Sequence, residues 1–213
     1  MRMKFMKTIV LVAVLFTSGC SRDYFADGGT LNMEETAVLG VSTMDYLKSH
    51  GKLFDTLTAL ITLSGLEPVV NASGTTFLAP QNYSIRNYFN LVYPDPEKRP
   101  ATFADIPEED MDKITEIIKN YIIPDEEILR NQLATTYSYA TTYGDRKARF
   151  NLVRGDYLGN VNMGANYIIF SLDMSEPGQK EQYQSVRVVT SDLRSTNGIV
   201  QVLNADTHIF GFN

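Results

Sequence analysis

The chain has 213 residues, 44% of them hydrophobic, and its 19 Lys and Arg residues against 25 Asp and Glu residues give a formal net charge of −6. An acidic chain of this kind repels phosphate backbones, so the composition argues against nucleic-acid binding. Cys20 is the only cysteine, which excludes disulfides within the chain and leaves no second thiol for a metal site or a nucleophile. The hydrophobic content suffices for one sizeable core without disulfides.

The first twenty residues predict a bacterial lipoprotein signal. A basic head is followed by the apolar run 9–16 and then by Ser18-Gly19-Cys20. This order is typical of a secretory signal, and the apolar run is too short to span a bilayer. A cysteine directly after small residues suits lipoprotein processing, in which the thiol receives a diacylglyceryl group and the chain is cut before it. The alternative is an ordinary secreted protein with a chance cysteine, because Thr17 stands where the lipoprotein pattern has Leu.

We therefore expect three segments. Residues 1–19 form the signal peptide, residues 20–40 comprise lipidated Cys20 and a flexible tether, and residues 41–213 form a single domain. The segment after Cys20 is polar and has no periodic apolar pattern, and a flexible tether of this length spans roughly 25 Å.

The first half of the expected domain has mainly helical patterns. Apolar residues at helical spacing predict two short helices between residues 42 and 64, divided at Gly51. The run 75–79 is rich in β-formers and predicts a strand that Pro80 ends. A further helix of one or two turns is expected over 83–89, and another begins at Pro107, where fixed φ and three acidic residues favour a helix start.

The second half has strand patterns. Residues 135–143, 148–153, 167–172 and 186–189 are rich in β-branched and aromatic residues. In the last unit Asn197-Gly198 separates two apolar runs, which predicts a hairpin with a type I′ turn and positive φ at both turn residues. Helices followed by strands indicate the α+β class.

Three segments in this order resemble the conserved boxes of the fasciclin domain. The Leu-rich helix 54–66 and the strand 75–80 resemble the first box, 114–124 resembles the middle segment, and 195–203 resembles the second box. The residues that match the family motif, to which we assign structural roles, are Thr76, Phe77, Ala79, Pro80, Tyr121, Asn197 and Gly198.

Two departures limit what the resemblance implies. Asn120-Tyr121 stands where the family often has Tyr-His, and Gln201 stands where His is frequent. We therefore do not expect this chain to share the kind of adhesion that depends on a histidine at these positions in the family.

The resemblance implies a fasciclin-like fold, a twisted β-sandwich wedge with several short helices packed along it. It also implies an adhesion or interaction module without a catalytic site. Lipid-anchored single copies of this domain occur in Gram-negative bacteria, and some accompany outer-membrane nutrient-uptake systems. The leading hypothesis is thus a non-catalytic module, anchored in the outer membrane through Cys20, that contacts a protein or glycan partner at the cell surface or on the periplasmic face.

Two other functions stay open. A glycan-binding accessory subunit of an uptake system could use Tyr137 and Tyr139, which alternate along one expected strand and so share a face; the same rings could instead close the core. A hydrolase would need a polar cleft around His50 or His208. The sequence offers no catalytic triad motif, no metal-ligand spacing and no phosphate-binding loop, so no catalytic residue, cofactor or metal is expected.

Overall fold

Residues 37–155, 158 and 164–212 are described by the computed structural model, and all belong to a unit that spans residues 34–213. The predicted signal peptide, Cys20 and the tether up to residue 36 lie outside the described residues.

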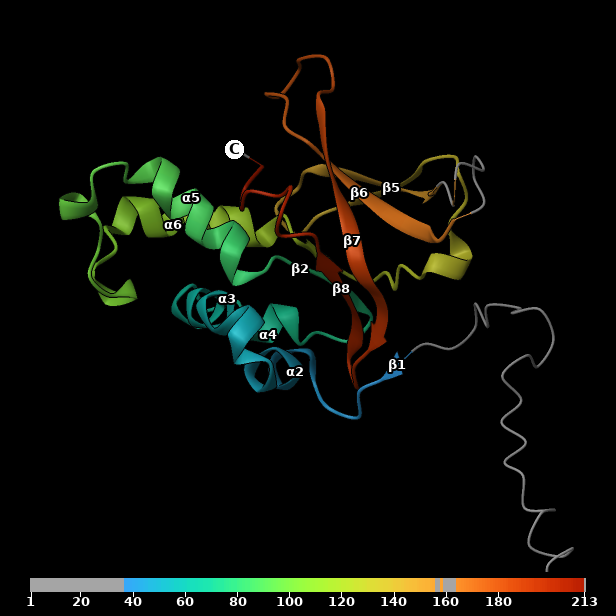
Figure 1. Ribbon diagram of the computed structural model, residues 1–213, viewed down its shortest axis with the longest axis horizontal. Coiled ribbons are helices and arrows are strands. Elements are labelled where there is room, and N and C mark those ends of the chain that lie inside the picture. Colours follow the sequence, from blue (N-terminus) through green and yellow to red (C-terminus); the bar gives the residue numbers. More distant parts are fainter. Residues whose placement is uncertain (1–36, 156–157, 159–163, 213) are drawn as a thin grey trace, which may run out of the picture. The chain divides into compact units, whose positions relative to one another are not determined.

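Helices dominate the first half of the unit and strands the second, as Figure 1 shows. The helices are α2 Thr43–Ser49, α3 Gly51–Leu63, α4 Glu67–Val70, α5 Asn82–Val92 and α6 Glu108–Lys119. The strands are β1 Ala37–Val38, β2 Thr75–Ala79, β3 Ile122–Ile123, β4 Ser138–Thr141, β5 Lys147–Arg154, β6 Asn166–Asp173, β7 Tyr183–Arg194 and β8 Gly198–Leu203. The predicted α+β class is confirmed.

The helix boundaries follow the local signals in the sequence. The Ser42 side chain accepts a hydrogen bond from the backbone of Asp45 and caps α2, and α3 begins at Gly51, where the pattern predicted a division. Gly65 follows α3 with a φ of +68°, the left-handed conformation that ends many helices. Pro107 directly precedes α6, also as predicted.

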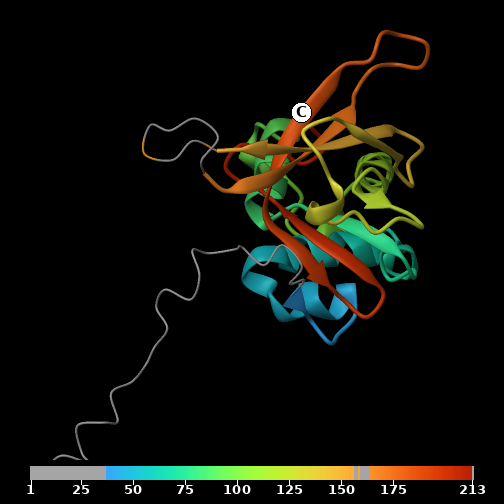
Figure 2. The same ribbon diagram turned by 90° about the vertical axis from the view of Figure 1, so that its right-hand side faces the viewer.

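The strands follow one path, β3-β2-β8-β7-β6-β5-β4. Strand β7 is the link, because its first half pairs antiparallel with β6 and its second half with β8. Within the second half the register shifts between Val188 and Leu193, and Asp192 has a φ of +60°, so an irregularity redirects the strand. Helices α2–α4 lie on one side of β8 and the β5–β6 pair lies on the other in both views (Figures 1 and 2).

The ordered part begins earlier than residue 41. Ala37 and Val38 pair in parallel with Leu193 and Arg194, and the Leu39 N–H donates to the Arg194 carbonyl at 2.8 Å. This pairing uses backbone groups, whereas the Val38 side chain stays exposed. Two residues expected in the tether therefore form a strand, which is too short for apolar periodicity to signal.

The core joins helices, strands and the C-terminal segment. Strands β2 and β8 are buried along their whole length. Residues 208–212 fold back onto the core, where the Phe210 and Phe212 rings stack on the Tyr121 ring at centroid distances of 5.6 and 6.0 Å. The sequence patterns did not reveal that this C-terminal segment is part of the core.

The predicted β7–β8 hairpin is confirmed, but the predicted turn type is wrong. Neither Asn197 nor Gly198 is among the described residues with positive φ. Gly198 instead pairs with Thr75 in the parallel β2–β8 ladder, where an added Cβ would overlap the Thr75 carbonyl oxygen. Glycine is required here because two backbones approach closely, and not because of its freedom to adopt positive φ.

This contact predicts a large loss of stability for Gly198→Ala, and a larger one for Gly198→Val. We expect the alanine to lower the free energy of unfolding by about 2 kcal/mol or more, because backbone atoms must move to admit the Cβ. Urea unfolding measures the effect. Gly51→Ala is the control, since its Cβ would meet nothing closer than Asp55 Cβ at 3.9 Å. An unfolding midpoint for Gly198→Ala equal to that of wild type would contradict the steric explanation.

Candidate interaction surface

Tyr139 lies in β4 and Tyr137 directly precedes this strand. The two residues are 62% and 48% exposed, respectively. Their ring centroids are 6.4 Å apart and the ring planes are tilted by 58°. The rings therefore do not close the core, and they present apolar faces and phenolic groups outward.

Arg149 on β5 extends this pair into a stack. Its guanidinium carbon lies 4.0 Å from the centre of the Tyr137 ring and 3.8 Å from that of the Tyr183 ring, distances typical of cation–π contacts. The two rings hold the guanidinium, while its Nε is buried without a hydrogen-bond partner in the described structure. The site thus combines aromatic area with a positive charge that forms no ion pair among the described residues.

The strand register places a second pair on the same face. Arg149 lies opposite Tyr139 on β4 and opposite Ser171 on β6, so these side chains point to one side. Further along the same face, Arg187 on β7 covers the ring of Tyr167 on β6 at 4.4 Å. We call this outward surface of β4–β7 the Tyr–Arg face; its members are Tyr137, Tyr139, Arg149, Tyr167, Tyr183 and Arg187.

Only the two β4 tyrosines of this face were singled out from the sequence. A signal for Arg149, Tyr167 and Arg187 exists, because each lies next to an apolar residue of a strand pattern (148 and 150, 168, 186 and 188) that is buried, and successive side chains of a strand point to opposite faces. The partners across the strands, however, depend on the register, which the sequence does not specify.

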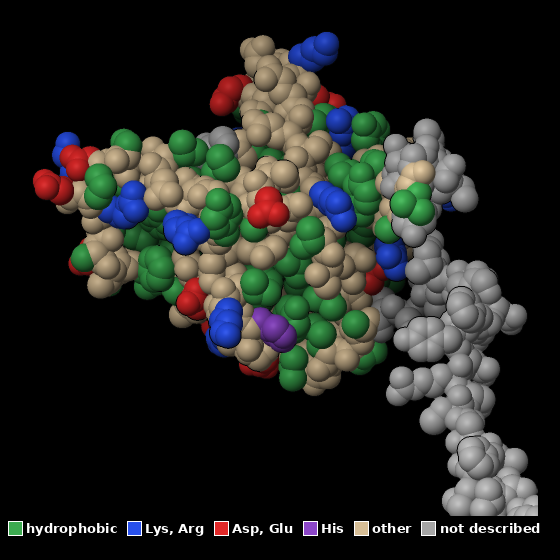
Figure 3. All heavy atoms as spheres, viewed as in Figure 1, with side chains coloured by type: hydrophobic (Ala, Val, Ile, Leu, Met, Phe, Trp, Pro, Cys, Tyr) green, Lys and Arg blue, Asp and Glu red, His purple; other side chains and the backbone are tan. Residues whose placement is uncertain are grey.

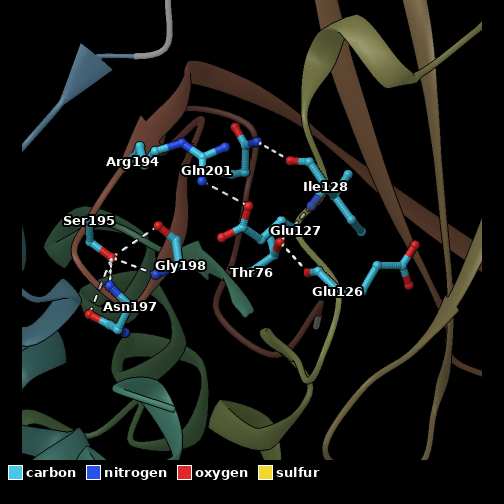
Figure 4. A network of polar contacts seen from close by, with 9 residues as sticks. All are labelled: Thr76, Glu126, Glu127, Ile128, Arg194, Ser195, Asn197, Gly198 and Gln201. Atoms are coloured by element: carbon cyan, nitrogen blue, oxygen red, sulfur yellow. Dashed lines mark hydrogen bonds and ion pairs between the residues drawn. The ribbon is translucent and has the colours of Figure 1, made fainter. Parts of the chain in front are cut away.

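The seven motif residues lie in or beside the core. Phe77, Ala79, Pro80 and Tyr121 are buried. The Thr76 hydroxyl donates to the Glu126 carbonyl at 2.7 Å and accepts from the Ile128 N–H at 2.8 Å, so it fixes the segment beside β2 (Figure 4).

Asn197 joins the hairpin to the helices. Its side-chain oxygen accepts from the Thr43 N–H at the start of α2, and its amide group donates to the Val70 carbonyl at the end of α4. The nearby Ser195 hydroxyl lies 3.0 Å from both the N–H and the carbonyl oxygen of Gly198 (Figure 4). In the motif dipeptide, the Asn197 side chain therefore bridges α2 and α4, and Gly198 allows the β8 backbone to approach that of Thr75.

Gln201, which replaces the histidine frequent in the family, is buried and fully bonded. Its amide group donates to the Ile128 carbonyl and to Asp192 Oδ1, and its oxygen accepts from the Asp192 N–H. These bonds hold the redirected part of β7 against the neighbouring segment. Gln201 is thus not available to a partner in this structure.

The two histidines do not assemble a catalytic group. His50 Nδ1 lies 2.9 Å from both Ser49 Oγ and the Tyr46 carbonyl at the exposed α2–α3 junction. His208 is buried, and its Nε2 lies 2.8 Å from the Tyr121 hydroxyl. Neither has a carboxylate partner among the described contacts, and the described residues contain no group of three or more His, Cys, Asp and Glu suited to a metal.

Comparison with known proteins agrees with the motif resemblance. A family model described as the fasciclin domain matches residues 52–205. No curated protein matches the chain. Within the described residues, no helix is long and apolar enough to cross a bilayer.

The buried His208 makes the stability of the domain depend on pH. Burial lowers the pKa of His208 to about 4, whereas an imidazole in the unfolded chain has a pKa of about 6.5. Between these values the unfolded chain binds a proton that the folded domain does not, so stability present above pH 6.5 is lost as the pH falls toward 4.

We expect His208 to account for a loss of about 2 kcal/mol in the free energy of unfolding between pH 7 and pH 5. Urea unfolding at several pH values measures it. His208→Gln is the comparison, because glutamine cannot become charged but still offers a hydrogen-bonding group to Tyr121. If both proteins lose the same stability over this range, His208 does not control the pH dependence.

Proposed function

Since the chain belongs to the fasciclin family, whose domains are generally non-catalytic adhesion or interaction modules, we propose that it is a lipid-anchored envelope protein that contacts its partner through the Tyr–Arg face. The anchor is Cys20. The domain itself carries no catalytic role in this proposal, which agrees with the separate positions of His50 and His208.

The Tyr137–Arg149–Tyr183 stack is the observation that carries the proposal. Tyrosine and arginine are enriched where single residues dominate binding energy. The stack holds both residue types in fixed positions on a sheet, so little side-chain freedom is lost when a partner binds. Three of the four tyrosines on this face make cation–π contacts with an arginine of the same face.

The order of the first twenty residues supports the anchor. The basic head, the short apolar run and the small residues before Cys20 fit lipoprotein processing. Ser21 follows the cysteine, not the Asp that marks inner-membrane retention in some bacteria, so we place the anchor in the outer membrane with the domain at the cell surface or on the periplasmic face.

A glycan partner is the second candidate. Exposed Tyr137 and Tyr139 offer ring faces on which a sugar could stack, and their phenolic groups could bind its hydroxyls. A glycan-binding accessory subunit of an outer-membrane uptake system would use the same face as a protein-binding module.

The anchor predicts that Cys20→Ser no longer incorporates a palmitate analogue and fractionates with soluble proteins. The thiol is the only attachment point in the sequence, so no other residue can replace it. Metabolic labelling of cells that express wild type or Cys20→Ser measures this. Equal label in both proteins would overturn the anchor.

The contact face predicts that Tyr137→Ala combined with Tyr139→Ala weakens partner binding about tenfold or more, as expected for tyrosines at the centre of an interface. The melting temperature should stay near that of wild type, because both side chains are exposed. Capture of partners from native membranes and binding to a glycan array, each compared with wild type, measure the loss and separate protein from glycan partners.

Tyr143→Ala is the matched control, since this tyrosine is 44% exposed but lies outside the Tyr–Arg face. It should bind like wild type. If the double variant captures the same partners to the same extent as Tyr143→Ala, the proposed face is wrong.

A further inference from the structure

A groove of about 740 Å³ lies between helices α3 and α5 and the segment 99–106. Its volume is in the range of sites that take small ligands or a few side chains of a partner. It shares no lining residue with the Tyr–Arg face.

The groove carries positive charge in an acidic chain. Lys52 from α3, Arg86 from α5 and Arg99 from the following segment all line it, and none of them forms an ion pair in the described structure. The one carboxylate in the lining, Asp55, accepts a hydrogen bond from the Asn82 amide group at 2.6 Å. Figure 3 shows Lys and Arg side chains on the surface over the region of α5.

The lining also contains aromatic and aliphatic side chains. The Phe89 and Phe103 rings lie 6.5 Å apart, and Phe103 is 37% exposed. Ile106 lines the groove beside them. A ligand that fits this lining needs an apolar group together with negative charge.

The walls of the groove are held in place. The Asn82 amide group donates to the Gly51 carbonyl and its oxygen accepts from the Thr56 N–H, so the start of α5 is tied to α3. In the third wall Thr102 and Asp105 form a reciprocal cap. The groove is therefore formed before a ligand arrives.

The larger groove along α6, of about 1130 Å³, lacks this charge excess. There Lys113 pairs with Glu109 and Asp110, and Lys119 pairs with Glu116. The four carboxylates of its lining outnumber its three cations, the third of which is Arg146.

We propose that the groove between α3, α5 and segment 99–106 binds an acidic segment of a protein partner that inserts an aromatic or aliphatic side chain. Carboxylates of the segment pair with Lys52, Arg86 and Arg99, and Phe89 and Phe103 contact its apolar side chain. This inference rests on the chain being an interaction module, but it is independent of the Tyr–Arg face.

The test is fluorescence anisotropy with the chain from residue 20 onward, carrying Cys20→Ser, and labelled peptides. The probe is a peptide of alternating Glu and Phe; one comparison peptide has Gln for each Glu and another has Ser for each Phe. An oligogalacturonate of similar charge is the glycan probe. We expect saturable binding of the Glu–Phe peptide that weakens with rising salt, because exposed charges are screened, and weaker binding of the other probes.

Arg86→Gln should weaken binding about twofold to fivefold, as for an exposed ion pair, and the triple variant Lys52→Gln, Arg86→Gln, Arg99→Gln by more than tenfold. Phe103→Ala should also weaken it. Lys180→Gln removes one exposed positive charge outside the groove and should bind like wild type, as should the Tyr137→Ala, Tyr139→Ala variant. Melting temperatures confirm that each variant is folded.

Equal affinity for the Glu–Phe and Gln–Phe peptides, or equal losses for Arg86→Gln and Lys180→Gln, would overturn the proposal. Tighter binding of the oligogalacturonate than of the peptide would assign the groove to acidic glycans instead, which also overturns it. Loss of peptide binding in the Tyr137→Ala, Tyr139→Ala variant would place the peptide on the Tyr–Arg face.

Discussion

The close approach of Gly198 to the Thr75 backbone is the constraint on which the rest of the fold depends. It allows β8 to pair in parallel with β2, and so brings the last strand against the strand that lies between α4 and α5 in the chain. Asn197 then reaches the start of α2 and the end of α4. A Cβ at position 198 would separate these elements, because the obstruction is backbone that cannot rotate away.

The path of β7 follows from this contact. One end of β7 must reach β8, while the other end pairs with β6, so the strand changes register near Asp192. Gln201 stabilises that irregularity with hydrogen bonds to the backbone and side chain of Asp192. The β4–β7 strands consequently bury one face against the core and leave the other face, with its tyrosines and arginines, toward solvent.

The sequence predicted helix ends and the hairpin, which depend on residues close together in the chain. It did not predict contacts between residues that are far apart in the chain. Pro107 and Gly65 mark helix ends through their own backbone preferences, and Asn197-Gly198 correctly marked a hairpin. The reason for that glycine was wrong, since the obstructing Thr75 is more than a hundred residues away in the chain. The Arg149 stack was missed for a related reason: its rings come from separate strands whose register no local pattern determines.

The motif residues and the candidate contact residues therefore belong to different parts of the molecule. Thr76, Tyr121 and Asn197 have their polar groups bonded within the domain, and so does Gln201 where the family often has histidine. Groups that are already paired add little to binding, because a partner would have to break one contact to form another. Arg149 and the cations of the α3–α5 groove form no ion pair among the described residues, so a carboxylate of a partner would not have to displace one. We infer that family membership specifies the scaffold, whereas the partner is specified by residues that the family motif does not include.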